Sequence, residues 1–293
     1  MLTREKIALK VLEEAGGSLP RTVLVKLLFL LRMETTLEKN SSFYDFVPYK
    51  YGPYSFALYR DLYRLESYGY VSQGDSQFVL NENLADETRR HTSKLARNLQ
   101  LAISNVYERY GHETPNSLVR IVYDKYPWYA INSEHSARKN VAIPFRPKAT
   151  PAVYTIGYEG KSVDAFFNCL LDKGIEAAVD VRANPVSRKY GFSGSRMRQI
   201  GESLGLKYRH YPSLGIPSKE RANLSDEASR AQLFDQYELT VLVNSKQEIR
   251  DVGKLMSRTP SVLVCVERDV NSCHRGRLSH AIAYETSLEV INL

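Results

Sequence analysis

Reactive side chains gather at the end of a predicted buried strand, Ser261 to Glu267. Glu267 closes this strand, and Cys273 and His274 precede a helix predicted from Arg275 to Glu285. A thiol at a helix N-terminus beside histidine and arginine favours the thiolate, the nucleophilic form of cysteine. A glutamate at a strand end can act as general acid, general base or nucleophile. We therefore take Glu267, Cys273 and His274 as candidate catalytic residues. Structural roles compete with this interpretation, namely a small helix-start residue for Cys273 and a cap for His274.

A metal centre is not expected from these residues. Cys265, Cys273, His274 and His280 show neither a CxxC motif nor a paired-histidine spacing. Cys265 should also point away from its neighbours in the strand, because side chains alternate between the two faces of a sheet. The sequence accordingly predicts no metal and no cofactor.

A second polar group follows the strand predicted from Ile175 to Val181. Asp180 and Arg182 lie on the same side of this strand end, and a nearby guanidinium stabilises the charged form of a carboxylate. We expect Asp180 to act with Glu267 as an acid–base pair. The alternative is a structural Asp–Arg pair that fixes the following loop.

A third loop, residues 157–162, follows the strand predicted from Ala152 to Ile156. It ends like a phosphate-binding loop in Gly160-Lys161-Ser162, but Thr155 stands where that motif requires its first glycine, so we reject a Walker-type site. A weaker anion site at the N-terminus of the next helix and a simple tight turn both remain open.

The order of predicted strands and helices in the second half indicates that these loops meet at one edge of a sheet. A strand, a helix over Ser162 to Asp172 and a second strand follow each other within about 30 residues, which indicates a βαβ unit and a parallel sheet. Ligands bind beyond the carboxyl ends of such strands. The predicted substrate-binding residues are Gly157, Tyr158, Glu159, Arg182, Ser187, Arg188, Tyr208 and Arg275.

Basic charge is concentrated in one part of the chain. The net charge is +7, and residues 182–221, here called the basic segment, contain nine basic and two acidic residues, a surplus of 9 − 2 = +7. Such a surplus suits phosphate groups, and Tyr190, Tyr208 and Tyr211 interleave with it as possible stacking surfaces. The predicted nucleic-acid-binding residues are Lys189, Arg196, Arg198, Lys207 and Arg209.

The first half is predicted to be mainly helical and to resemble a winged helix. Apolar residues at helical spacing predict helices over Glu5 to Glu14 and after Pro20. A third helix, capped by Ser55, is predicted to run to Tyr68, and a hairpin is predicted after it. Further helices are expected over Asp86 to Tyr110 and Pro115 to Tyr126. We therefore predict a recognition domain at 1–128, a linker at 129–151 and an α/β domain at 152–293.

Composition sets broader limits. With 293 residues, 43% hydrophobic and 25% charged, the chain resembles ordinary folded proteins rather than disordered or fibrous ones. No apolar run is long enough to span a bilayer, so no membrane partner is expected. Three cysteines cannot form a disulfide framework, which predicts a reducing, cytoplasmic location.

The loop motifs resemble a known family. Residues 154–160 (YTIGYEG), 179–185 (VDVRANP), 208–215 (YRHYPSLG) and 273–275 (CHR) together resemble the domain of unknown function 488 family over about residues 152–285. This resemblance implies an α/β domain with these blocks around one site, but no reaction. Residues 26–31 and 49–55 are similar to the Panacea antitoxin-associated domain over about residues 5–72. That likeness implies protein or nucleic-acid recognition in toxin–antitoxin or phage-defence contexts.

Two functions follow as hypotheses. The first is an enzyme acting on a nucleic acid, DNA more than RNA, or on a nucleotide, and hydrolysing a glycosidic or phosphoester bond, with a possible protein partner at the first domain. The second is a non-catalytic DNA-binding regulator or antitoxin-like adaptor whose α/β domain binds a small anion. A thiol-transfer role for Cys273 is a weaker third.

Overall fold

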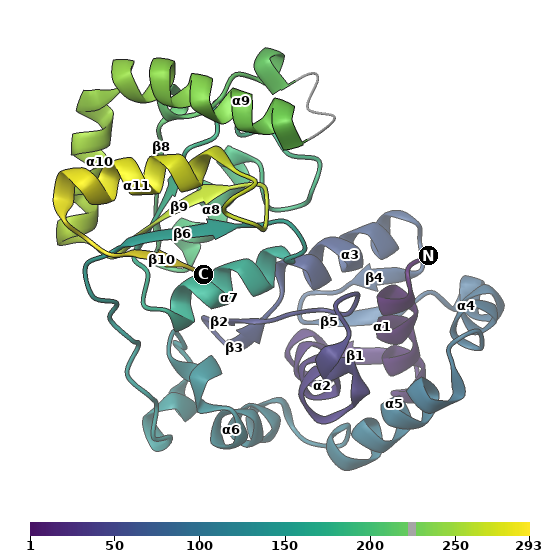
Figure 1. Ribbon diagram of the computed structural model, residues 1–293. Coiled ribbons are helices and arrows are strands. Elements are labelled where there is room, and N and C mark those ends of the chain that lie inside the picture. The colour runs from purple at the N-terminus through teal and green to yellow at the C-terminus, as the bar shows by residue number, and fades with distance from the viewer. Residues whose placement is uncertain (222–226) are drawn as a thin grey trace. The chain divides into compact units, whose positions relative to one another are not determined.

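A computed structural model of the chain describes residues 1–221 and 227–293 and divides them into two compact units, Met1–Phe145 and Arg146–Leu293 (Figure 1). The first unit extends beyond the predicted boundary at residue 128. Ala130 and Ala137, which lie in the predicted linker, are buried in its core, so much of the 129–151 segment belongs to a folded domain.

The first unit combines helices with two small antiparallel sheets. Strands β1, β5 and β4 form one sheet in that order, and β2 and β3 form the other. Apart from the β2–β3 hairpin between α2 and α3, the order α1, β1, α2, α3, β4, β5 is the one expected of a winged helix, and membership of that class stays a prediction. The elements are α1 (Thr3–Glu14), β1 (Ser18–Pro20), α2 (Arg21–Glu34), β2 (Val47–Tyr49), β3 (Gly52–Tyr54), α3 (Phe56–Ser67), β4 (Val71–Gln73), β5 (Gln77–Leu80), α4 (Ala85–Thr92), α5 (Arg97–Tyr110) and α6 (Pro115–Lys125).

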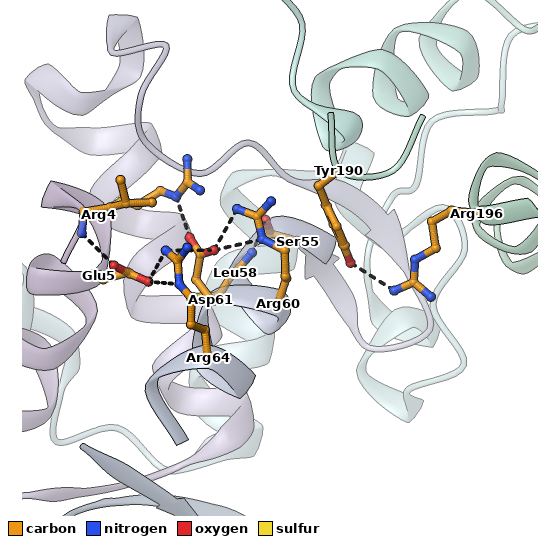
Figure 2. Close-up of polar contacts among 10 residues, drawn as sticks. Arg4, Glu5, Ser55, Leu58, Arg60, Asp61, Arg64, Tyr190 and Arg196 are labelled. Atoms are coloured by element: carbon orange, nitrogen blue, oxygen red, sulfur yellow. Dashed lines mark hydrogen bonds and ion pairs between the residues drawn. The ribbon is translucent and has the colours of Figure 1, made fainter. Parts of the chain in front are cut away.

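Local signals set some of these boundaries correctly and one wrongly. Ser55 caps α3 as predicted, since its hydroxyl oxygen accepts the backbone N–H of Leu58 at 3.2 Å (Figure 2). The single helix predicted over Asp86 to Tyr110 is wrong. It breaks into α4 and α5, because Ala96 has an extended backbone (ψ 142°). This break lets both helices pack against α1.

A charged cluster joins α1 to α3 (Figure 2). Asp61 is fully buried and accepts hydrogen bonds from Arg4 at 2.5 Å and Arg60 at 2.8 Å. Glu5, also buried, accepts from Arg64. Because each buried carboxylate is paired, the cost of removing these charges from water is offset.

The second unit contains the predicted parallel sheet, so the α/β fold class is confirmed. All neighbouring strands are parallel, in the order β10, β6, β9, β7, β8. The predicted helix from Ser225 to Val243 begins outside the described residues. The elements are β6 (Val153–Gly157), α7 (Val163–Asp172), β7 (Ala177–Asp180), α8 (Gly194–Ser203), β8 (Lys207–His210), α9 (Glu227–Tyr237), a π-helical stretch (Glu238–Leu242), α10 (Lys246–Arg258), β9 (Ser261–Cys265), α11 (His274–Thr286) and β10 (Val290–Asn292).

Helices cover both faces of this sheet (Figure 1). Val179, Val181 and Leu263 pack with Ile249 and Val252 of α10 and with residues of α11 on one face, while α7 and α8 cover the other. Burial on both faces explains the continuous apolar strands. None of the helices in the described ranges combines the length and apolar character that a membrane span requires.

Candidate functional site

Asp180 and Arg182 form a closed, buried pair at the end of β7. The Asp180 carboxylate accepts hydrogen bonds from the backbone N–H, Nε and Nη2 of Arg182 at 3.1, 2.8 and 2.5 Å, and from the Tyr208 hydroxyl at 2.7 Å. These four bonds use all the lone-pair positions of a carboxylate. The side chain of Asp180 is 0% exposed, so it has neither a free oxygen nor access for a substrate.

The guanidinium of Arg182 is equally enclosed. Its Nη1 donates to the Tyr158 hydroxyl at 3.1 Å and to the Phe192 carbonyl at 2.9 Å. Burial alone would lower the pKa of Arg182, but the hydrogen bonds and charge of Asp180 raise it above its ordinary value. Tyr158 is buried and stacks on Phe192 at 4.3 Å. Asp180, Arg182, Tyr158 and Tyr208 therefore hold the loop between β7 and α8, which is the structural alternative considered for the Asp–Arg pair.

The predicted pairing of Asp180 with Glu267 finds no support in this geometry. Val179 and Val181 point to the face covered by α10 and α11, so Asp180 between them points to the opposite face. Glu267 lies near Cys265, with Oε2 3.7 Å from Sγ, on the face where Leu263 meets α11. The sheet thus separates the two carboxylates.

Gly157 sets the spacing between the loops after β6 and β9. A Cβ atom at this position would lie 1.8 Å from the carbonyl oxygen of Glu267, so only glycine permits the approach. Two further contacts join the loops: Glu159 N–H donates to the Val266 carbonyl at 2.9 Å, and Arg268 N–H donates to the Glu159 carboxylate at 2.9 Å. Gly157 therefore shapes the site through its backbone, and Glu159 does so through both its backbone and its carboxylate.

Arg275 supports the same loop from within. It is buried, and its guanidinium donates to the carbonyls of Glu267 at 2.5 Å and Arg268 at 3.0 Å. These contacts direct Arg275 at the backbone around Glu267 rather than at a bound anion.

Cys265, Cys273 and His274 form a buried cluster beside Glu267. Their ligand atoms all lie within 4.8 Å of one another, and Nδ1 of His274 is 3.9 Å from each sulfur. The Nε2 of His274 is 3.0 Å from the Val181 carbonyl oxygen. The fold thus assembles a group that sequence spacing did not reveal, because α11 begins directly above the end of β9.

The two thiols affect each other. The hydrogen bond with Cys273, together with burial, raises the pKa of the Cys265 thiol. The same hydrogen bond lowers the pKa of Cys273, and so do His274 and Arg275, while burial opposes them. Of the two, Cys273 holds the more acidic thiol.

Basic side chains of the β7–α8 loop, of α8 and of β8 are here called the basic surface. On β8, Lys207 and Arg209 alternate with Tyr208 and therefore point to the opposite face of the sheet from the Tyr208 ring. Lys189 of the β7–α8 loop donates to the Tyr158 carbonyl at 2.9 Å, which ties it to the carboxyl end of β6. Burial lowers its pKa, while Glu159 opposes the shift. Arg196 donates to the Tyr190 hydroxyl at 3.0 Å (Figure 2), and Arg198 lies over the Tyr208 ring. The members are Arg188, Lys189, Arg196, Arg198, Lys207 and Arg209.

None of these six side chains lies within 4.0 Å of a carboxylate in the described parts of the chain. Five are exposed and Arg196 is half-buried. Ser187, predicted to bind substrate, instead accepts the backbone N–H of Lys189 at 3.2 Å and shapes this loop. The basic surface therefore carries a charge that the described residues leave unneutralised.

Comparison with known proteins agrees with this architecture. A search of the curated proteins found no match. A family profile matches residues 162–282, which begin at the cap of α7 and end within α11. The second unit of this chain thus carries a domain of the family described as Domain of unknown function DUF488.

Proposed function

We propose that this protein is an enzyme acting on a nucleic acid, DNA more than RNA, or on a nucleotide, and that it hydrolyses a glycosidic or phosphoester bond. The observation that carries the proposal is the basic surface, six cationic side chains without an ion-pair partner among the described residues. An unneutralised group of this kind attracts phosphates and releases their counterions on binding. The half-buried ring of Tyr190 lies beside Arg196, where it could stack on a base.

The reacting groups belong at the carboxyl edge of the sheet. Glu267 is half-buried there beside the cluster of Cys265, Cys273 and His274, and a carboxylate in such a position is suited to general acid–base work. Because Asp180 is enclosed by its own partners, we assign it to holding the loop and Glu267 to the reaction.

The first unit is proposed as the recognition domain. Its helices and β4–β5 hairpin follow the winged-helix order, and such domains bind nucleic acid or protein partners. This observation also supports the second candidate, a DNA-binding regulator whose second unit senses a small anion.

The free thiols support a proposal for the compartment. Cys169, Cys265 and Cys273 are all free, and free thiols persist in reducing compartments. We propose the cytoplasm, where nucleic-acid substrates are also found.

The test uses labelled single- and double-stranded DNA and RNA, including strands with modified bases, incubated with wild type and with Glu267→Gln. We expect product from wild type and none from Glu267→Gln, with folding unchanged by circular dichroism. Shifted bands without product from either protein would favour the regulator, and neither binding nor product would refute both.

A charge variant tests the basic surface itself. Arg188→Ala, Arg198→Ala and Arg209→Ala together should weaken binding and reduce the slope of log K against log salt by roughly 0.9 for each phosphate that is no longer neutralised. The matched control removes the same charge from exposed positions of α10, with Arg250→Ala, Lys254→Ala and Arg258→Ala. An equal loss of affinity in both variants would mean that net charge, rather than this surface, drives binding.

A further inference from the structure

The geometry of the cysteine–histidine cluster fits a tetrahedral metal ion. In tetrahedral zinc sites the Zn–S distance is about 2.3 Å and the Zn–N distance about 2.0–2.1 Å, which places a sulfur and a nitrogen ligand roughly 3.6 Å apart. The Nδ1 atom of His274 lies 3.9 Å from Sγ of Cys265 and 3.9 Å from Sγ of Cys273. Shifts of a few tenths of an ångström would therefore bring Nδ1 to the tetrahedral separation from each sulfur, and the two sulfurs lie within 4.8 Å of each other.

The protonation of His274 also fits a ligand role. Its Nε2 faces the Val181 carbonyl oxygen at 3.0 Å, and a carbonyl can only accept, so Nε2 carries the hydrogen. In the neutral ring this leaves the lone pair on Nδ1, the nitrogen that faces both sulfurs. Histidine ligands of metals are commonly held in this way, with the second ring nitrogen donating to a backbone carbonyl or a carboxylate.

The cluster is buried and is packed against a fixed aromatic ring. Cys265, Cys273 and His274 are all buried, and the Tyr237 ring packs edge-on against His274 at 5.4 Å. The hydroxyl of Tyr237 donates to the Leu214 carbonyl at 2.8 Å, so this ring is fixed in place. A cavity of about 450 Å³, lined in part by Cys273, Asn271 and His280, adjoins the cluster at Cys273.

Glu267 lies beside the three candidate ligands but is not one of them. Its Oε2 lies 3.7 Å from Sγ of Cys265, at the edge of the three-atom group rather than within it. Three protein ligands with a carboxylate at the edge leave one position for water, which is the arrangement of catalytic rather than structural zinc sites. Two thiolates and an imidazole select zinc over magnesium or calcium, which prefer oxygen ligands.

We propose that Cys265, Cys273 and His274 bind one zinc ion, with a fourth position next to Glu267. This proposal is independent of the nature of the substrate. Its test is metal binding, which can be measured in the absence of any reaction. It replaces the expectation from sequence that these residues hold no metal, which rested on the missing CxxC spacing.

The experiment measures metal directly. Full-length protein purified under reducing conditions should contain close to one zinc per chain by elemental mass spectrometry. Cys265→Ser, Cys273→Ser and His274→Gln should each lower zinc affinity by at least tenfold. The matched control, Cys169→Ser, alters a half-buried thiol of α7 outside the cluster and should retain full zinc.

A second readout needs no variant and covers the case in which a substitution prevents folding. Replacing the metal of wild type by Co²⁺ should give the thiolate-to-cobalt charge-transfer bands and the intense visible bands of a tetrahedral site. A chelator should abolish these bands and increase by two the number of thiols that react with a disulfide reagent. Wild type with reduced thiols that takes up neither zinc nor cobalt would overturn the proposal. So would uptake unchanged in the double variant Cys265→Ser, Cys273→Ser, or a Cys265–Cys273 disulfide as the resting state of the metal-free protein.

Discussion

Replacing Asp180 by asparagine tests whether this residue holds the site or performs the reaction. Asparagine keeps the shape, and its oxygen can still accept from Arg182 N–H and Nε. Its NH₂ group would face two donors, Nη2 of Arg182 at 2.5 Å and the Tyr208 hydroxyl at 2.7 Å in the native protein. The guanidinium of Arg182, 2% exposed, would also lose its counter-charge. Removing one partner of a buried ion pair costs about 3–5 kcal/mol, which is a large part of the stability of an ordinary domain.

The assay is urea unfolding followed by circular dichroism. Trp128, the one tryptophan of the chain, lies in the first unit, so its fluorescence reports that unit separately. Tyr208→Phe removes a single hydrogen bond and should cost about 1 kcal/mol, and Glu267→Gln, at a half-buried position, should change stability by less than about 1 kcal/mol. If Asp180→Asn unfolds with wild type but loses turnover, Asp180 is a catalyst and the reasoning from its closed partners is wrong.

Three further predictions concern backbone and burial. Gly157→Ala places a methyl group against the Glu267 carbonyl and should destabilise by about 3 kcal/mol or more, whereas Gly160→Ala, with open space but φ +73°, should cost about 1–2 kcal/mol in the same urea assay. Burial lowers the pKa of Lys26 from 10.5 to about 7, so the unfolded chain binds more protons between these values. Stability should therefore rise with pH across this window by up to about 1.4 kcal/mol per unit, and Lys26→Met should abolish the rise in unfolding experiments at pH 7, 8 and 9. Ser162→Ala removes the cap that accepts the N–H of Ala165 at 3.0 Å and should lower the unfolding free energy by about 1 kcal/mol; an unchanged midpoint would show that the cap contributes nothing.

Local chemistry predicts much of the second unit. Ser162 caps the start of α7, and Gly174, at φ +69°, follows its end. Both helix ends are therefore set by short-range contacts. The strands could be recognised because burial on both faces requires continuous apolar runs. In the first unit, the break between α4 and α5 carries no glycine or proline, so only packing against α1 determines it.

The sequence pointed to Glu267, Cys273 and His274 as members of the candidate site, but not to their grouping with Cys265. Alternation correctly places Cys265 and its strand neighbours on opposite faces. What alternation cannot tell is which face α11 covers, and that decides whether Cys273 and His274 meet Cys265 or lie across the sheet. Because the sequence does not show which face each helix covers, it could not separate Asp180 from Glu267. In the structure, β7 directs Asp180 towards α8, where it contacts Arg182 and Tyr208.

The strand order also governs how the second unit is synthesised. The first two strands made, β6 and β7, do not pair with each other, because β9 lies between them. About 80 residues separate β7 from β9 along the chain. Until β9 leaves the ribosome, two apolar strands therefore expose unpaired edges, which are prone to association with other chains. Long-range pairing of this kind also slows folding. The nascent second unit thus passes through a window in which its two central strand edges are exposed together.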